Sequence, residues 1–130
     1  MANQTFGPGC VFCAIDDELM VARNHLAYAV RDTSPVTPLH TLILPRRHVA
    51  SYFDLDATEK RAIENLLEEN RLGILACDPE VAGFNIGVNI GAVAGQTIFH
   101  CHVHLIPRRR GDVANPRGGV RAVIPGKADY

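Results

Sequence analysis

The sequence predicts one α+β domain, in which a meandering antiparallel sheet carries one long helix and a short helical segment near the N-terminus. Short runs of branched and apolar residues, separated by turns and prolines, are typical of neighbouring antiparallel strands. One longer stretch has the spacing of an amphipathic helix. The chain has 130 residues, of which 47% are hydrophobic and 21% are charged, which is enough for one buried core.

Four apolar runs predict strands, over residues 26–31, 41–44, 84–89 and 98–106, and a further short strand is expected near 120–124. Two prolines make residues 32–38 a loop. A helical turn is expected at 16–18. The long helix is expected to begin at Asp56, which resembles a capping box with Glu59, and to end at Asp78-Pro79. Its expected buried stripe consists of Ala62, Ile63, Leu66, Leu67, Gly73, Ile74 and Cys77.

We expect a single domain over residues 1–130, with 1–9 as a flexible arm and 111–130 as an irregular tail. The formal net charge of −1 gives no general attraction to nucleic acid or to an anionic membrane. We expect no targeting segment, because residues 1–9 are polar and rich in glycine and proline, and no apolar run approaches the roughly 20 residues of a membrane span. Four cysteines in such a chain indicate a reducing compartment, so a cytoplasmic location is expected.

Three histidines alternate with apolar residues between His100 and Pro107. In an extended strand this period of two puts His100, His102 and His104 on one face. Aligned imidazoles are good ligands for zinc, copper or iron, and a neutral imidazole is also a competent nucleophile. The strand alone does not separate a metal site from a catalytic site.

The flanking residues favour a reaction centre that acts on phosphate. The Gly-rich residues 91–97 precede the histidines, and free backbone N–H groups there can form an anion-binding concavity, to which Gln96 and Thr97 add donors. Taken alone, this stretch is more simply an ordinary hairpin connection. Beside a row of histidines, it indicates a bound phosphate and a reactive imidazole.

These residues also resemble a known family. Ala-Gly-Gln-Thr-Ile-Phe-His-Cys-His-Val-His-Leu-Ile-Pro, residues 94–107, resembles the signature of the histidine triad (HIT) superfamily of nucleotide hydrolases and transferases. Residues 32–48 resemble the other conserved segment of that superfamily in order and spacing. The likeness covers about residues 10–112 and implies the HIT fold and a homodimer. The tail lies outside it.

The resemblance also implies roles for individual residues. His102 matches the nucleophile that attacks the α-phosphate of a nucleotide and forms a nucleotidyl-histidine. His104 matches the histidine that contacts the phosphoryl oxygens, while the backbone of His100 orients the nucleophile and His40 is a further catalytic residue. The implied nucleotide-binding residues are Asp32 for the ribose, Asn89, Gln96 and Thr97 for the phosphate, and Phe12, Ile15, Val30 and Leu42 for the base.

A second group of residues predicts a structural zinc ion. The two-residue gap in Cys10-Val-Phe-Cys13 allows both thiolates to bind one tetrahedral Zn²⁺. The resemblance adds His48 and His100, which match zinc ligands in some members of the superfamily. The alternative is a redox pair, but no thioredoxin-like βαβ pattern surrounds these cysteines.

The expected substrate is a purine nucleotide or a dinucleoside polyphosphate. The segment after the histidines, Pro107 to Asp112, resembles the fragile histidine triad branch, which cleaves dinucleoside polyphosphates and releases a nucleoside monophosphate. The alternatives are an adenosine phosphoramidase-type hydrolase, a non-catalytic nucleotide-binding or sensor protein, and a metal-binding module. Arg108, Arg109 and Arg110 lack interleaved aromatic residues, which argues against a nucleic-acid partner.

Overall fold

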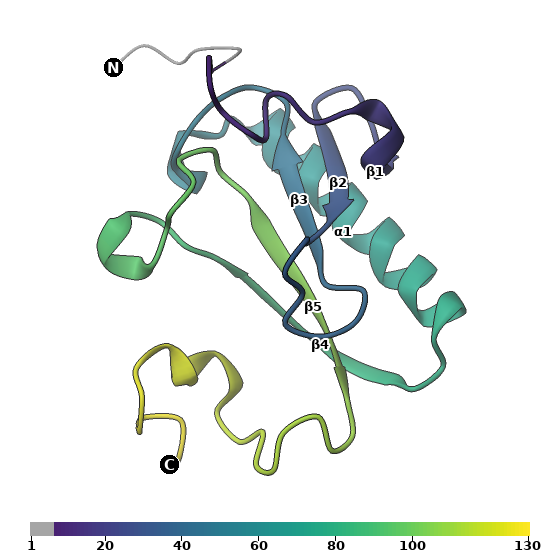
Figure 1. Cartoon of the computed structure of the whole chain (residues 1–130), viewed down its shortest axis with the longest axis vertical. Helices are drawn as coiled ribbons and strands as arrows, with labels where there is room; N and C mark the ends of the chain where they lie inside the picture. The colour runs from purple at the N-terminus through teal and green to yellow at the C-terminus, as the bar shows by residue number, and fades with distance from the viewer. Residues whose placement is uncertain (1–6) are drawn as a thin grey trace.

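A computed structural model describes residues 7–130, and Figure 1 shows a single open sheet with one long helix. This architecture confirms the predicted α+β fold class. The elements in chain order are η1 (Asp17–Leu19), β1 (Met20–Arg23), β2 (Ala27–Arg31), β3 (Thr41–Pro45), η2 (Tyr52–Asp54), α1 (Ala57–Cys77), β4 (Val81–Val88), η3 (Ala92–Ala94), β5 (Val103–Arg109) and η4 (Gly119–Val123). The η elements are short 3-10 helices.

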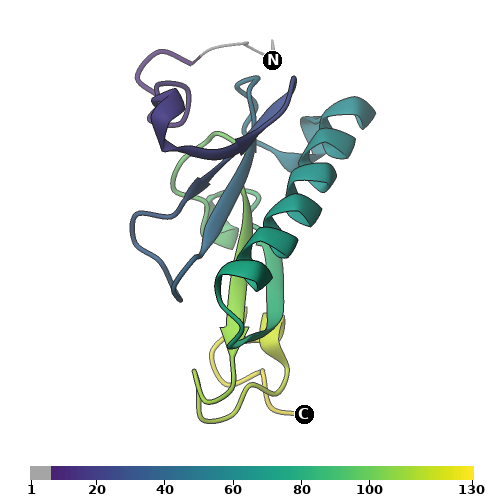
Figure 2. The ribbon, with the colours of Figure 1, turned by 90° about the vertical axis from the view of Figure 1, so that its right-hand side faces the viewer.

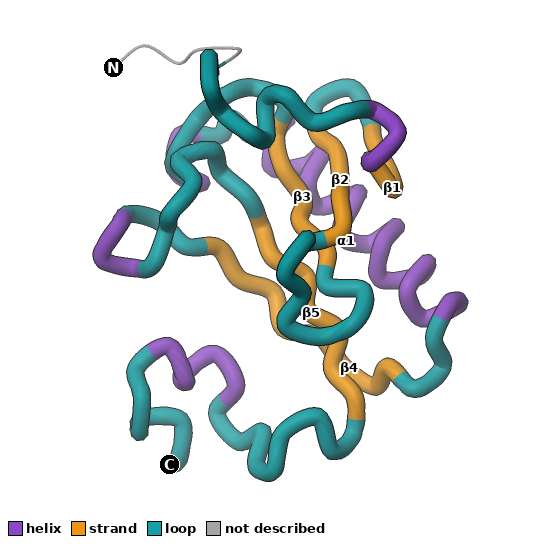
Figure 3. The backbone as a smooth tube through the Cα atoms, viewed as in Figure 1, coloured by secondary structure: helices purple, strands orange, loops and turns teal. Residues whose placement is uncertain are grey.

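The sheet has five strands in the order β1-β2-β3-β5-β4, and every neighbouring pair is antiparallel. The first three strands form the predicted meander. The last strand, β5, then lies between β3 and β4, so β4 forms an edge of the sheet (Figure 3). Strand β1 was not predicted from its short apolar stretch, and its four residues alternate between half-buried and exposed.

The predicted strand over residues 98–106 is wrong in its limits. β5 begins only at Val103, because the N–H of Cys101 donates to the carbonyl of Val49 at 2.7 Å and so does not join the sheet. β5 then continues to Arg109, since β4 starts early and pairs Val81 with Arg109. The strand expected near 120–124 is also wrong, because residues 119–123 form η4.

Helix α1 starts with the predicted capping box. The Asp56 carboxylate accepts from the N–H of Glu59 at 2.8 Å, and the Glu59 carboxylate accepts from the N–H of Asp56 at 3.0 Å. The buried row runs in i+4 steps through Leu66, Asn70 and Ile74, which leaves the predicted Gly73 and Cys77 exposed. Asn70 is buried without penalty to its amide, which donates to the Leu66 carbonyl at 2.8 Å.

The two faces of the sheet carry separate clusters of apolar side chains. Alternation along β2 and β3 directs Ala29 and Ile43 toward α1, and directs Val30 and Leu42 to the opposite face. Figure 2 shows α1 on one side of the sheet and the N-terminal segment on the other. The hydroxyl of Tyr28 donates to the carbonyl of Phe12 and fixes that segment. Within residues 7–130, no helix is long and apolar enough to span a membrane.

The ends of the chain differ in how they pack. Residues 1–6 of the expected arm lie outside the described residues, and Gly7 is buried with its Cα against the ring of His48. A Cβ on Gly7 would lie 2.6 Å from that ring, so only glycine allows this close approach. The tail contains η4, and no strand is formed among residues 111–130.

Candidate active site and metal centre

A cavity of about 1000 Å³ opens on the face of the sheet away from α1. It contains His102 and His104 beside an apolar wall, and most of the residues that the sequence assigned to nucleotide binding line it. They are Phe12, Ile15, Val30, Asp32, Leu42, Asn89 and Thr97. Three further apolar residues of the wall, Val11, Leu19 and Ile98, were not among the residues that the sequence assigned to nucleotide binding.

His102 has one ring nitrogen fixed and the other free. Its Nδ1 lies 2.8 Å from the carbonyl oxygen of His100, and a carbonyl only accepts hydrogen bonds. The proton of the neutral ring is therefore on Nδ1, and the lone pair is on Nε2. The ring packs against Phe12 with centroids 5.0 Å apart, which holds its orientation in the cavity. This is the arrangement of an imidazole nucleophile.

A chain of hydrogen bonds determines the tautomer of His104. The backbone N–H of Val36 donates to Nδ1 of His40 at 3.0 Å, so the proton of His40 is on Nε2. That Nε2 donates to Nδ1 of His104 at 2.9 Å, which leaves His104 with its own proton on Nε2. Among residues 7–130, this buried Nε2 has no hydrogen-bond partner. It is a donor without an acceptor, at the boundary of the cavity.

The environment of His40 and His104 disfavours the charged form of both imidazoles. Burial, followed by the neighbouring His102 and His40, lowers the pKa of His104 to about 4. Burial also lowers the pKa of His40, although Asp32 opposes this effect from 3.6 Å. The contribution of Val36 could not be predicted from the sequence, because a backbone N–H has no residue signature.

The structure places Gln96 outside the cavity. Its side chain is buried and fully engaged by the backbone: the carbonyl accepts from Gly91 at 2.9 Å, and the amide donates to Ala50 and Ile98 at 2.9 and 3.2 Å. It has no donor left for a phosphate. Gln96 instead holds the Gly-rich loop, in which Gly91 and Gly95 have φ values of 92° and 97°.

The four predicted zinc ligands converge on one point. Nδ1 of His48 lies 3.3 Å from Nδ1 of His100, and Sγ of Cys13 lies 3.4 and 3.5 Å from these two nitrogens. Sγ of Cys10 lies 3.6 Å from Nδ1 of His100. Tetrahedral Zn²⁺ with bonds of about 2.05 Å to nitrogen and 2.3 Å to sulfur separates its ligands by about 3.3–3.6 Å.

The surroundings of these ligands also fit a cation. The Nε2 proton of His100 donates to the carbonyl of Pro45 at 2.8 Å, which leaves the Nδ1 lone pair for a metal. The N–H of Gly7 donates to Sγ of Cys13 at 3.2 Å, as expected for a thiolate. The side chain of His100 thus lies with the predicted zinc ligands, whereas its carbonyl contacts His102.

Two arginines at the end of β5 are paired with carboxylates. Arg108 binds the Asp112 carboxylate at 2.8 Å through two nitrogens and also contacts Asn85. Arg109 binds the carboxylate of Asp78 at 2.8 Å. Arg108 accordingly holds the pKa of Asp112 far below its usual range. Both cations are therefore already engaged by carboxylates of the same chain.

Comparison with known proteins agrees with the geometry of the site. Residues 15–111 match the family described as HIT domain. The chain belongs to the HIT family. Members of this family are mostly nucleotide hydrolases or transferases. This confirms the resemblance inferred from the histidine motif.

Individual relatives have only moderate sequence identity to this chain. The chain is 37% identical over 112 residues to an uncharacterized 16.1 kDa HIT-like protein of Mycoplasma pneumoniae, covering 83% of this chain and 74% of the relative. It is 34% identical to an AP-4-A phosphorylase of Mycobacterium tuberculosis, covering 85% of this chain but only 59% of that enzyme. The crystal structure of a Zn-bound histidine triad family protein from Mycobacterium smegmatis matches with a TM-score of 0.74 at 28% identity, over 83% and 81% of the two chains.

Proposed function

We propose that this HIT protein hydrolyses a phosphoanhydride bond at the α-phosphorus of a nucleotide, through a nucleotidyl intermediate on His102. The observation that carries the proposal is the pair of opposite tautomers in one cavity. His102 presents a lone pair on Nε2, and His104 presents a proton on Nε2. One group can attack phosphorus while the other donates to an oxygen that gains charge.

The reaction balances in two steps. In the first, Nε2 of His102 forms a bond to phosphorus while the bond to the leaving oxygen breaks, and that oxygen departs with the electron pair. The imidazolium that results keeps its Nδ1 proton on the His100 carbonyl. In the second, water attacks phosphorus, the P–N bond breaks, and the water proton passes to solvent. The products are a nucleoside monophosphate and the free leaving group.

The nucleotide is held by the remaining residues of the cavity. Phe12, Val30 and Leu42 offer an apolar wall for a purine. Asp32 can accept from ribose hydroxyls, while one of its oxygens keeps its bond to the N–H of Ser34 at 2.8 Å. Asn89 and Thr97 can donate to phosphate oxygens. The AP-4-A phosphorylase relative makes diadenosine tetraphosphate the first substrate to test.

The metal centre supports this site without taking part in the chemistry. Cys10, Cys13, His48 and His100 would hold Zn²⁺ as a closed set of four ligands, with no position left for a substrate. The ion would brace the N-terminal segment against the loop that carries His100. We also infer a cytoplasmic location, where free thiols persist.

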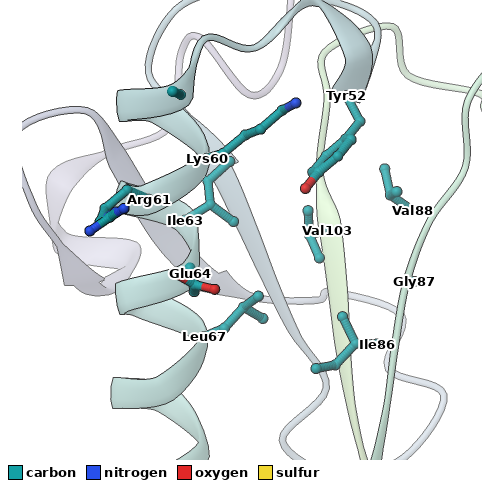
Figure 4. A pocket seen from close by; sticks show the side chains of 11 residues that line it. Tyr52, Lys60, Arg61, Ile63, Glu64, Leu67, Ile86, Gly87, Val88 and Val103 are labelled. Carbon is teal, nitrogen blue, oxygen red and sulfur yellow. The ribbon is translucent and has the colours of Figure 1, made fainter.

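A homodimer formed through β4 completes the proposal. The outer edge of β4 has no neighbouring strand among the described residues, and a groove of about 480 Å³ lies between this strand and α1 (Figure 4). Its walls include Tyr52, Ile63, Leu67 and Ile86, of which Ile86 is 53% exposed. An open edge beside an apolar groove favours pairing with a second copy.

The nucleophile is tested by trapping the intermediate. Diadenosine tetraphosphate with labelled α-phosphates is mixed with the protein and quenched in base, which preserves a phosphoramide bond to histidine. We expect label on the wild-type protein and none on His102→Ala. His25→Ala, which removes an exposed histidine far from His102 in the sequence, serves as the control and should keep the label. Binding without label or turnover would instead identify a nucleotide sensor.

A further inference from the structure

A second cavity, of about 460 Å³, adjoins the nucleotide cavity, and Asn89 and His104 line both of them. We propose that this cavity binds the leaving group and selects acyl nucleotides, in which a carboxylic acid with an uncharged apolar body is joined to the α-phosphate. The inference rests on the proposed function, which puts the nucleotide in the first cavity. The leaving group would then lie in the second cavity, with His104 between the two.

The floor of this cavity is set by the pairing of β4 with β5. Asn85 pairs with Ile106, and Gly87 pairs with His104, so these four residues face the same side of the sheet. Gly87 has no side chain to fill the space beside His104. A Cβ built on Gly87 would meet no atom within 4 Å, so the space next to the donor is open.

The outer wall of the cavity is built by the tail. Val120 and Val123 of η4 line it, although they are 62% and 76% exposed. Both lie beyond residue 111, where the match to the HIT domain ends. The wall therefore lies outside the residues matched to the HIT domain, and the two valines have apolar surface that a ligand would cover.

The tail has internal contacts that give η4 a defined position. Gly118 has a φ of 85°, and a Cβ there would lie 2.0 Å from the carbonyl oxygen of Ala128, so the end of the chain folds tightly onto it. The guanidinium of Arg121 donates to the carbonyl of Lys127 at 3.0 Å. Arg117 and Arg121 both stack on the ring of Tyr130, at 4.9 and 4.7 Å.

The chemistry of the walls argues against a charged leaving group. None of the described residues that line this cavity is lysine, arginine, aspartate or glutamate. The nearby Arg108 is paired with Asp112, and Arg109 is paired with Asp78. A polyphosphate would lose its hydration here without gaining a cationic partner. Transfer of an alkyl or aryl group from water into this cavity is favourable.

The donor tautomer of His104 favours the same substrate class. When Nε2 of His102 bonds to phosphorus, the bond from phosphorus to the acyl oxygen breaks, and a carboxylate leaves with the electron pair. It needs a hydrogen bond from Nε2 of His104 but no proton. An amine leaving group would need a proton, and a neutral imidazole is a poor acid.

The test compares octanoyl adenylate with acetyl adenylate, which share the nucleotide and the bond that breaks. We expect the wild-type protein to show a kcat/KM at least about tenfold higher for octanoyl adenylate. The double variant Val120→Ser/Val123→Ser, and separately Gly87→Val, should bring this ratio close to one. Ile124→Ser, an exposed neighbour outside the cavity, should keep the wild-type ratio.

Other outcomes separate the two proposals. A wild-type ratio near one, with hydrolysis of acetyl adenylate and diadenosine tetraphosphate intact, would overturn the leaving-group cavity and leave the proposed function standing. No hydrolysis of any of the three substrates would overturn the proposed function itself. If the double variant changed the sedimentation of the protein but not the ratio, the valines would be a protein contact and the cavity proposal would be wrong.

Discussion

The carbonyl oxygen of His100 accepts a hydrogen bond from Nδ1 of His102 at 2.8 Å, while the imidazole of His100 points to Cys10 and Cys13. One residue thus connects the metal group with the proposed nucleophile. Its ring is completely buried, and its other nitrogen donates to Pro45. The backbone of His100 therefore links the position of the Cys/His group to the hydrogen bond that sets the tautomer of His102.

Cys13→Ser should therefore affect both the metal and the stability of the fold. We expect the wild-type protein, purified without added metal, to contain about one zinc ion per chain and the variant to contain almost none. The midpoint of thermal unfolding should fall, because the ligands link the N-terminal segment to the loop at His100. Elemental analysis and thermal unfolding measure these two effects. Cys77→Ser, at an exposed cysteine, should change neither, and full zinc content in Cys13→Ser would contradict the assignment.

His40→Ala should remove the hydrogen-bond donor at Nε2 of His104 while the His104 side chain stays in place. Without the donor at 2.9 Å, Nδ1 of His104 can take up the proton, and Nε2 no longer donates into the cavity. We expect kcat to fall about 10²–10³-fold, as for loss of one preorganised donor, with a much smaller change in KM. His40→Gln, whose amide can also donate, should recover part of the loss. ¹⁵N NMR of the His104 ring should show the altered tautomer, and an unchanged spectrum would contradict the relay.

Much of the fold follows from local sequence patterns. Apolar runs correctly predict β2 and β3 as buried strands, and the Asp56–Glu59 capping box correctly predicts the start of α1. The stripe of α1 is less predictable, because buried Asn70 satisfies its amide within the helix and looks polar in the sequence. The position of β5 beside β3 depends on contacts far apart in the chain, which no local pattern contains.

The site was predictable as a set of residue types but not as an arrangement. Period-two spacing predicts three histidines on one face of a strand. In the structure, His100 and His102 precede β5, and the ring of His100 is directed toward the cysteines. The donors of Gln96 are engaged by backbone groups that the sequence does not place near it. The cavity wall built by η4 could not be predicted, because the sequence of the tail has neither periodicity nor a motif.

Glu59 should make the stability of the protein depend on acid pH. The hydrogen-bonded Arg47 lowers the pKa of this buried carboxylate below that in the unfolded chain. Its contribution is therefore present above the unfolded pKa and is lost as pH falls through the lower folded pKa. Glu59→Gln can keep the capping bond but loses the charge pair, and should cost about 1.5–3 kcal/mol near pH 7.

Denaturant unfolding across the acid range measures this effect. The difference in free energy of unfolding between the wild-type protein and Glu59→Gln should shrink steadily below about pH 4, where the carboxylate of the unfolded chain begins to take up its proton. Glu69→Gln, at an exposed position of the same helix, should follow the wild-type curve. A difference that stayed constant from pH 7 to pH 3 would show that the charge of Glu59 is not what stabilises the fold.

Ile86→Arg should separate the proposed homodimer into single chains. Ile86 lies on β4, is 53% exposed, and lines the groove between that strand and α1. In a two-fold interface the same patch occurs on both copies, so one substitution would bury a guanidinium group in the interface twice. Desolvating each unpaired charge costs several kcal/mol. Sedimentation velocity should show a wild-type dimer and a monomeric variant at micromolar concentration. Leu72→Arg, on an exposed part of α1 outside the groove, should remain a dimer, and dissociation of both variants alike would place the contact elsewhere.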